Sequence, residues 1–225
     1  MKASAKFARL LQLLSLFGLA AASYLFAQPA PQAPADQVRN LTKDVAVPMR
    51  DGVVLRADVL LPAASGRFPA LVYRTPYGKE FALKGYKTFQ KAASRGYAVV
   101  IQDVRGRYAS DGDFNAYRNE GRDGYDTIEW TARQPWCDGN VGTFGLSYPG
   151  AVQWLAAVEN PPHLKAMVPA MTFATPRNFF YSGGVFDLSW LDWIWMNIAP
   201  DIRRRRNLSG PKTYEQARES WKEQH

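Results

Sequence analysis

The chain has 225 residues, of which 47% are hydrophobic and 21% are charged. This length and composition indicate a globular protein with a sizeable core, and they exclude a disordered chain. The single cysteine, Cys137, excludes an internal disulfide and a cysteine-rich metal site, so we expect it to have a structural role. Residues 1–27 contain three basic and no acidic residues. Without them the formal net charge falls from +8 to +5.

The N-terminal segment is typical of an export signal. Three basic residues precede an apolar run over residues 10–27, and a Gln-Pro-Ala-Pro segment follows it. The pattern predicts a signal peptide cleaved near Ala22 or Ala27, and therefore a secreted or periplasmic protein. Because the run is nearly long enough to cross a bilayer, the alternative is a protein anchored in the membrane through residues 10–27. We expect residues 28–42, rich in Pro, Ala and Gln, to form a flexible linker.

From Val45 onward, strand patterns alternate with helix patterns. Two apolar runs flank an Asp-Gly turn and predict a hairpin, and further apolar runs predict strands; the predicted strands cover residues 45–49, 53–61, 68–74, 97–103, 141–146 and 164–170. Helical spacing predicts helices over residues 83–94, 120–132 and 151–158. The alternation predicts an α/β fold, with helices on both faces of a mostly parallel sheet. We expect this core to span residues 43–175.

Ser147 is the strongest candidate for a catalytic residue. It lies between Gly145 and Gly150, where an apolar strand meets an apolar helix. This pattern presents a nucleophilic serine on a sharp strand-to-helix turn, and the helix N-terminus favours the negative charge that forms in acyl transfer. The usual motif has glycine two residues after the serine, where this chain has Pro149. A structural serine in a turn is the alternative.

The sequence becomes rich in aromatic residues over residues 176–225. Clusters at Phe179–Tyr181 and at Trp190, Trp193 and Trp195 have helix-like spacing. We interpret this segment as the start of a helical cap, or lid, whose aromatic side chains line a substrate pocket. The alternative is a helical segment that buries its aromatics in a core. Arg203–Arg206 lacks interleaved aromatics and a recognisable binding fold, so we expect a solvated surface run and no nucleic-acid partner.

Several ordered motifs together resemble the cocaine esterase and X-Pro dipeptidyl peptidase group of α/β-hydrolases. These motifs are Met49–Gly52, Arg74–Tyr77, Gln102–Arg107, Ser110–Phe114, Asp138–Gly142 and Gly145–Gly150. The resemblance covers about residues 45–175. It implies an α/β-hydrolase fold and a serine hydrolase that acts on a small ester, an amide or a short peptide.

The resemblance implies roles for three residues. Ser147 would attack a carbonyl carbon and form an acyl-enzyme. The Tyr77 hydroxyl and the Tyr148 backbone N–H would hold the oxyanion. Pro169 and the Arg105 loop would be architectural. No cofactor or metal is expected, because the chain has no phosphate-loop glycine pattern and no His/Cys ligand cluster.

A general base for Ser147 is not evident. His163 precedes strand 164–170 and should lie on the opposite side of the sheet from Ser147, and His225 is the last residue. In this fold the triad acid and histidine follow the nucleophile, and in the resembling family they follow the lid. Acidic residues in the cap are expected at the surface or at helix caps; they are Asp187, Asp192 and Asp201.

We therefore expect the chain to be the N-terminal part of a longer hydrolase that is nearly inactive by itself. Its strand 164–170 would then be an apolar sheet edge, which predicts poor solubility. One alternative is a non-catalytic binding module on the same scaffold. Another is a membrane-anchored protein that uses its aromatic region for contacts.

Overall fold

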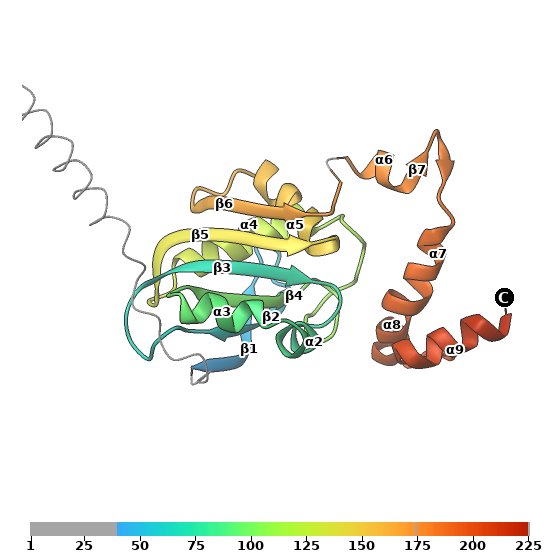
Figure 1. Cartoon of the computed structure of the whole chain (residues 1–225), viewed down its shortest axis with the longest axis horizontal. Helices are drawn as coiled ribbons and strands as arrows, with labels where there is room; N and C mark the ends of the chain where they lie inside the picture. The colour runs from blue at the N-terminus through green and yellow to red at the C-terminus, as the bar shows by residue number, and fades with distance from the viewer. Residues whose placement is uncertain (1–39, 174, 225) are drawn as a thin grey trace, which may run out of the picture. The chain divides into compact units, whose positions relative to one another are not determined.

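The computed structural model describes residues 40–173 and 175–224, and its central feature is a six-stranded sheet of order β1-β2-β4-β3-β5-β6 (Figure 1). The strands are β1 (Leu41–Pro48), β2 (Val54–Leu60), β3 (Phe68–Thr75), β4 (Ala98–Asp103), β5 (Cys137–Leu146) and β6 (Leu164–Ala170). Strand β2 pairs antiparallel with β1 and β4, and the remaining pairs are parallel. The predicted mostly parallel sheet is confirmed.

Helices cover both faces of this sheet. They are α2 (Lys79–Gly85), α3 (Thr88–Ser94), α4 (Glu120–Ala132) and α5 (Tyr148–Val158). Helix α3 lies on one face, and α4 and α5 lie on the other (Figure 1). Consecutive residues of β4 show why: Val100 packs in a cluster with Ile128 of α4, whereas Ile101 packs in a second cluster with Phe89 of α3. Because side chains alternate across a strand, a strand covered on both faces is mainly apolar, as residues 98–101 of β4 are.

Two predicted boundaries are wrong. The helix expected over residues 83–94 is two short helices, because the chain turns extended at Tyr86 (φ −117°, ψ 109°) directly after Gly85. Glycine is a weak helix former, so the helix ends at the position where its backbone is least constrained. Strand β1 begins at Leu41, so it takes up the last two residues of the predicted 28–42 linker. The predicted signal segment and residues 28–39 of that linker lie outside the described residues.

The segment after β6 is helical, as expected for a cap. Its elements are α6 (Pro176–Phe180), β7 (Tyr181–Ser182), β8 (Val185–Phe186), α7 (Ser189–Trp193), the π-helical turn η1 (Ile194–Ile198), α8 (Ala199–Arg205) and α9 (Tyr214–Gln224). Aromatic rings pack against one another between α6 and α7, with the Phe179 and Trp190 centroids 4.5 Å apart. The alternative interpretation predicted such packing of the aromatic side chains against one another.

The arginine run at the end of α8 has specific partners. Arg204, Arg205 and Arg206 are exposed, as expected, but they are not merely solvated. Arg205 donates to the carbonyls of Tyr108 and Ser110, and Arg206 pairs with Asp113 at 2.5 Å. Arg205 and Arg206 therefore hold the cap against the loop that follows β4, whereas Arg203 and Arg204 bond to Pro211 and Asp201 within the cap.

Strand β6 forms one edge of the described sheet. Its Val168 side chain is 64% exposed, and Met171 just beyond it is 82% exposed. The expected apolar edge is thus present. Among the described residues, no helix is both long enough and apolar enough to cross a membrane.

Candidate active site

Ser147 stands on the turn that joins β5 to α5. Its φ of 65° and ψ of −122° are rarely adopted by residues other than glycine. The turn is held from two sides: the Ser147 N–H donates to the Ala170 carbonyl at 3.0 Å, and the Ser147 carbonyl accepts from the N–H groups of Gly150 and Ala151 at 2.9 Å each. The residue is only half-buried. This is the strained, accessible geometry that a nucleophilic serine needs.

The glycines around Ser147 are required by close backbone contacts. A Cβ atom on Gly145, where φ is +154°, would lie 2.5 Å from the Pro149 Cβ. A Cβ atom on Gly150 would lie 2.8 Å from the Ala170 carbonyl oxygen. Both distances are far below van der Waals contact. The turn therefore admits only glycine at these two positions without a shift of the backbone.

Tyr77 meets Ser147 at this edge of the sheet. It follows the end of β3, where its N–H donates to the Thr75 hydroxyl at 3.1 Å. Its side chain is half-buried, its oxygen accepts the indole N–H of Trp193 at 3.1 Å, and its ring lies 6.5 Å from that of Tyr148, the residue after Ser147. Burial raises the pKa of Tyr77, while the hydrogen bonds with Trp193 and Ser147 oppose that rise. The structure therefore brings together two of the predicted site residues from separate strands.

Tyr148 begins helix α5 directly after Ser147 and places its ring in the core. As the first residue of α5, its N–H has no acceptor within the helix. Its buried ring stacks on Tyr117 with centroids 4.2 Å apart, and its hydroxyl donates to Glu120 at 2.8 Å. Burial, followed by the charge of Glu120, raises the pKa of Tyr148 well above its usual value. The side chain is thus a neutral anchor that fixes the direction of the backbone N–H.

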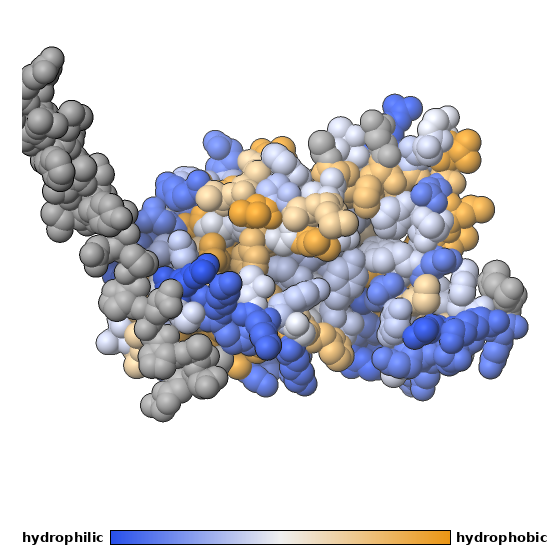
Figure 2. Space-filling view, viewed as in Figure 1, coloured by the Kyte–Doolittle hydropathy of each residue, from blue (hydrophilic) through white to orange (hydrophobic). Residues whose placement is uncertain are grey.

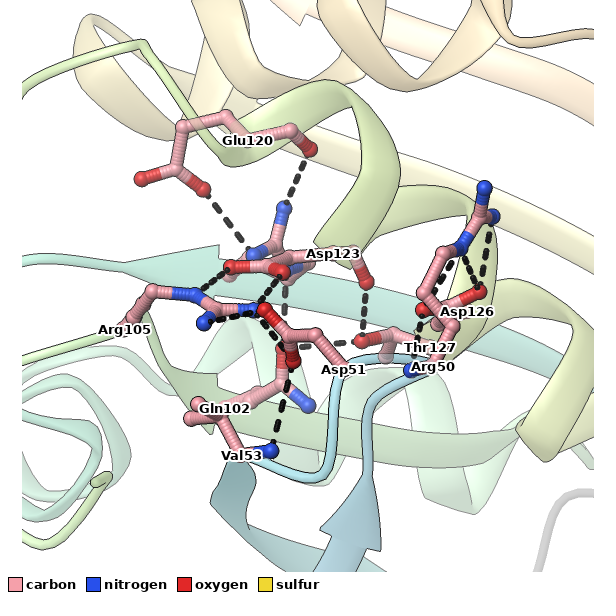
Figure 3. Close-up of polar contacts among 10 residues, drawn as sticks. Arg50, Asp51, Val53, Gln102, Arg105, Glu120, Asp123, Asp126 and Thr127 are labelled. Atoms are coloured by element: carbon pink, nitrogen blue, oxygen red, sulfur yellow. Dashed lines mark hydrogen bonds and ion pairs between the residues drawn. The ribbon is translucent and has the colours of Figure 1, made fainter. Parts of the chain in front are cut away.

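A buried ion pair supports that anchor. Arg74 pairs with Glu120 at 2.9 Å, and the two side chains are only 4% and 3% exposed. Arg74 also donates to Gln102 at 2.8 Å. Gln102 in turn accepts from the Thr127 hydroxyl at 3.0 Å (Figure 3). Burial raises the pKa of Glu120, and Arg74 opposes that rise. The set is incomplete, because the Gln102 Nε2 is buried without a hydrogen-bond partner, so the ion pair and the remaining hydrogen bonds must offset the cost of burying these groups.

The Arg105 loop is architectural, as the resemblance implied. Arg105 bridges two carboxylates, with contacts of 2.6 Å to Asp123 and 2.8 Å to Asp51 (Figure 3). The hydrogen bond to Asp123 is the main reason that the pKa of Arg105 is raised. These contacts tie the β1–β2 hairpin and the loop after β4 to helix α4.

His163 does not reach Ser147. It immediately precedes Leu164, which pairs with Val141, whereas Ser147 follows Leu146 at the other end of the same strand pair. The His163 Nδ1 lies 2.7 Å from a Glu129 carboxylate oxygen, and the backbone N–H of His163 donates to the same carboxylate at 3.1 Å. Its position agrees with the topology inferred from the sequence. His225 lies outside the described residues.

The three cap aspartates differ in their surroundings. Asp187 is exposed and accepts the Ser189 N–H at 2.9 Å, as expected of a capping residue. Asp192 is half-buried. Asp201 is buried, so the surface expectation is wrong for it: it accepts the Tyr108 N–H at 3.0 Å and pairs with Arg204 at 2.5 Å.

A cavity of about 450 Å³ lies beside Tyr77. Its lining comes from the core and the cap, and includes Phe81, Tyr108, Met196 and Tyr214. This volume is within the range of small-ligand sites. Neither Ser147 nor the aromatic residues predicted to line a substrate pocket are among its lining residues, so that role of the cap stays a prediction.

No group of three or more His, Cys, Asp or Glu side chains in residues 40–173 and 175–224 is arranged to hold a metal ion. Cys137 is a buried free thiol. Burial raises its pKa, which fits a structural role.

Sequence reasoning missed the long-range partners of the site. Arg107 is fully buried and donates to the Pro76 carbonyl at 2.8 Å and to the Ile198 carbonyl at 2.6 Å. Glu120 and Trp193 hold Tyr148 and Tyr77, respectively. The motif Gln102–Arg107 pointed to the loop after β4. The acceptors of Arg107 lie after β3 and in the cap, and no sequence pattern identifies them.

Residues 51–225 match the X-Pro dipeptidyl-peptidase (S15) family over most of the chain. The chain belongs to this family. Cocaine esterase from Rhodococcus sp. (strain MB1 Bresler) is 46% identical over 138 residues, which cover 60% of this chain and 24% of that protein. The putative serine esterase Mb1866c from Mycobacterium bovis is 32% identical over 174 residues, which cover 66% and 27%. The chain therefore spans about a quarter of these relatives.

Solved structures of related hydrolases have the same fold. A CocE/NonD family hydrolase from Staphylococcus aureus superposes with a TM-score of 0.66 at 30% identity, over 75% of this chain and 34% of that one. An α-amino acid ester hydrolase superposes with a TM-score of 0.63 at 27% identity, over 77% and 32%. The S15-family chain thus has an α/β-hydrolase fold, as the sequence motifs predicted.

Proposed function

We propose that this S15-family chain carries the nucleophile and the oxyanion site of a serine hydrolase that cleaves an ester or an amide. One observation carries the proposal: Ser147 stands on a strained strand-to-helix turn, and the ring of Tyr77 packs against that of the next residue, Tyr148, with centroids 6.5 Å apart. Small esters, amides and short peptides are the substrate classes that fit the family and its relatives.

In the proposed reaction, the Ser147 Oγ attacks the substrate carbonyl carbon and loses its proton to a base. The carbonyl oxygen becomes an oxyanion, which accepts hydrogen bonds from the Tyr77 hydroxyl and the Tyr148 N–H. The bond to the leaving group then breaks, and the leaving group takes a proton. Water later attacks the acyl-Ser147 ester and releases the acid. One well-placed oxyanion donor contributes about 10²–10³ in rate.

The base and its acid partner are proposed to come from a segment outside residues 1–225. The support is that His163 is occupied by Glu129 at the far edge of the sheet. In this fold, the acid and the histidine follow the nucleophile along the chain. In subtilisin, loss of the catalytic histidine lowers turnover about 10⁶-fold, so the 225-residue chain is expected to be nearly inactive.

The test compares two purified proteins on p-nitrophenyl acetate: the 225-residue chain, and the product of the longest reading frame that contains it. We expect turnover only from the longer protein, with Ser147→Ala as the inactive control. Ordinary esterase rates from the 225-residue chain would contradict the proposed division of the triad. A longer protein that binds substrates but lacks turnover would favour a non-catalytic binding module.

We also propose that the protein is exported, through the basic and apolar segment at residues 1–27. N-terminal sequencing of protein recovered outside the cytoplasm should begin after Ala22 or Ala27. An intact N-terminus in the membrane fraction would favour the anchored alternative.

A further inference from the structure

The indole of Trp193 connects the cap to the Tyr77 hydroxyl. Its Nε1–H donates to the Tyr77 oxygen at 3.1 Å, and its ring stacks over that of Tyr148, with centroids 6.2 Å apart and planes 19° apart. One cap side chain therefore contacts both residues that supply oxyanion donors in the proposed function.

The chemistry of the two groups gives this hydrogen bond a direction. An indole N–H can only donate, whereas a phenol both accepts and donates one hydrogen. With the Trp193 donor at its oxygen, the Tyr77 hydrogen must point toward a different partner. The Ser147 hydroxyl, on the turn directly before Tyr148, is the polar group available to receive it. An oxyanion forms one bond away from the atom attached to Ser147 Oγ, so a hydrogen aimed toward Ser147 is also aimed near the oxyanion.

Neighbouring indoles of the cap do not have this role. The Trp190 N–H donates to the Phe179 carbonyl at 3.3 Å, and the Trp195 N–H donates to the Ala217 carbonyl at 3.0 Å. Both bonds stay within the cap. Trp195 is therefore a suitable matched control for Trp193.

The cap segment that carries Trp193 is fastened to the turn that carries Tyr77. The Arg107 guanidinium donates to the carbonyl of Pro76, the residue before Tyr77, at 2.8 Å. It also donates to the carbonyls of Asn197 and Ile198 at 2.9 Å and 2.6 Å. One buried side chain thus sets the spacing between the two partners.

Resting on the proposed function, we propose that Trp193 is a positioning residue that directs the Tyr77 hydroxyl toward the oxyanion and so couples cap docking to assembly of the oxyanion site. A hydrogen bond donated to the phenol oxygen also polarises the O–H bond and makes it a stronger donor. In agreement, the Trp193 contact works against the burial that raises the pKa of Tyr77.

The kinetic test uses Trp193→Phe in the full reading frame, with Trp195→Phe as control. We expect kcat to fall about 5- to 30-fold, a part of the 10²–10³ for a lost donor, with KM changed less than about twofold. Trp195→Phe should keep both constants. In a Tyr77→Phe background, Trp193→Phe should cause no further loss, because its target hydroxyl is gone.

A structural readout needs no turnover. In ¹⁵N-tryptophan spectra of the 225-residue chain, Tyr77→Phe should shift the Trp193 indole N–H resonance and leave that of Trp195 in place. If Trp193→Phe does not fold, replacing Trp193 with benzothienylalanine keeps the ring shape and removes only the N–H.

The outcomes are distinguishable. If Tyr77→Phe is strongly impaired but Trp193→Phe keeps full kcat, the positioning role is wrong and the proposed function stands. Losses that multiply in the double variant would also overturn it, because Trp193 would then act independently of Tyr77. If Ser147→Ala retains turnover, the proposed function itself fails.

Discussion

The Tyr148 hydroxyl donates a 2.8 Å hydrogen bond to Glu120, so the residue directly after the candidate nucleophile is anchored from the far end of its side chain. Its backbone N–H, at the near end, opens α5 beside Ser147. The rigid side chain of Tyr148 therefore fixes the position of its own backbone N–H through Glu120, which lies outside the turn. The anchor depends on the charge balance between Glu120 and Arg74.

Glu120→Gln should be strongly destabilising. The substitution removes the negative partner of Arg74, which is buried and would be left as an uncompensated charge. Breaking a buried pair in this way costs about 3–5 kcal/mol in the free energy of unfolding. Urea denaturation measures the change, with exposed Glu80→Gln expected within about 0.5 kcal/mol of the parent. A loss below about 1 kcal/mol for Glu120→Gln would show that the pair is dispensable.

Arg107→Met should loosen the cap. The variant loses the hydrogen bonds to the Pro76, Asn197 and Ile198 carbonyls and leaves these buried acceptors without their donor. Unsatisfied buried groups cost about 1–3 kcal/mol each. Limited proteolysis should therefore cut faster within residues 176–224. Arg206→Met removes an exposed ion pair with Asp113 and should change the cleavage rate little. Equal cleavage rates for the two variants would show that Arg107 does not hold the cap in place.

Asp103 should make stability depend on pH in a definite direction. Burial raises its pKa from 3.8 to about 7, although the N–H groups of Lys79 and Ala109 oppose the shift. Between these values the folded state holds a proton that the unfolded state has lost, so the free energy of unfolding falls as pH rises from about 4 to about 7. The largest slope from one such group is about 1.4 kcal/mol per pH unit.

Asp103→Asn should flatten the pH dependence in that window. Urea midpoints measured from pH 4 to pH 7 give the slope for each protein. Asp138→Asn, which removes a carboxylate at the surface, controls for the change in net charge. Parallel curves for the parent and Asp103→Asn would contradict the raised pKa.

Gly145→Ala should disrupt the elbow. The new Cβ would lie 2.5 Å from the Pro149 Cβ and 2.7 Å from the Pro149 carbonyl oxygen, so the turn that carries Ser147 must move. We expect a loss of stability of more than about 2 kcal/mol, and loss of Ser147 reactivity in the full reading frame. Gly85→Ala is the matched control, because nothing lies within 4 Å of its Cβ position and alanine favours helix α2. A stable, reactive Gly145→Ala would show that the turn is not under constraint.

The sequence predicted what depends on local pattern. Strand β4 is an apolar run because both of its faces are covered, and Ser147 is flanked by glycines because the turn allows no Cβ there. The broken helix at Gly85 was missed because residues 83–94 keep helical spacing across the break. The contacts of Arg107, Glu120 and Trp193 were not predictable from pattern, because each joins segments that only tertiary folding brings together.

The arginine run at residues 203–206 shows which properties of a segment its sequence predicts and which it does not. The surface around α8 is hydrophilic (Figure 2), and Arg204–Arg206 are exposed there, as the sequence predicted, whereas Arg203 is half-buried. Its contacts with the carbonyls of Tyr108 and Ser110 did not, because a backbone acceptor leaves no mark in the sequence.

The most direct test of the account is covalent capture of the nucleophile. The product of the full reading frame is treated with a fluorophosphonate, and the modified residue is located by peptide mass spectrometry. The account predicts one adduct, on Ser147. This adduct is absent in Ser147→Ala and forms about 10²–10³-fold more slowly in Tyr77→Phe. An adduct on another residue, or equal labelling of Ser147→Ala, would contradict the central claim that Ser147 is the nucleophile.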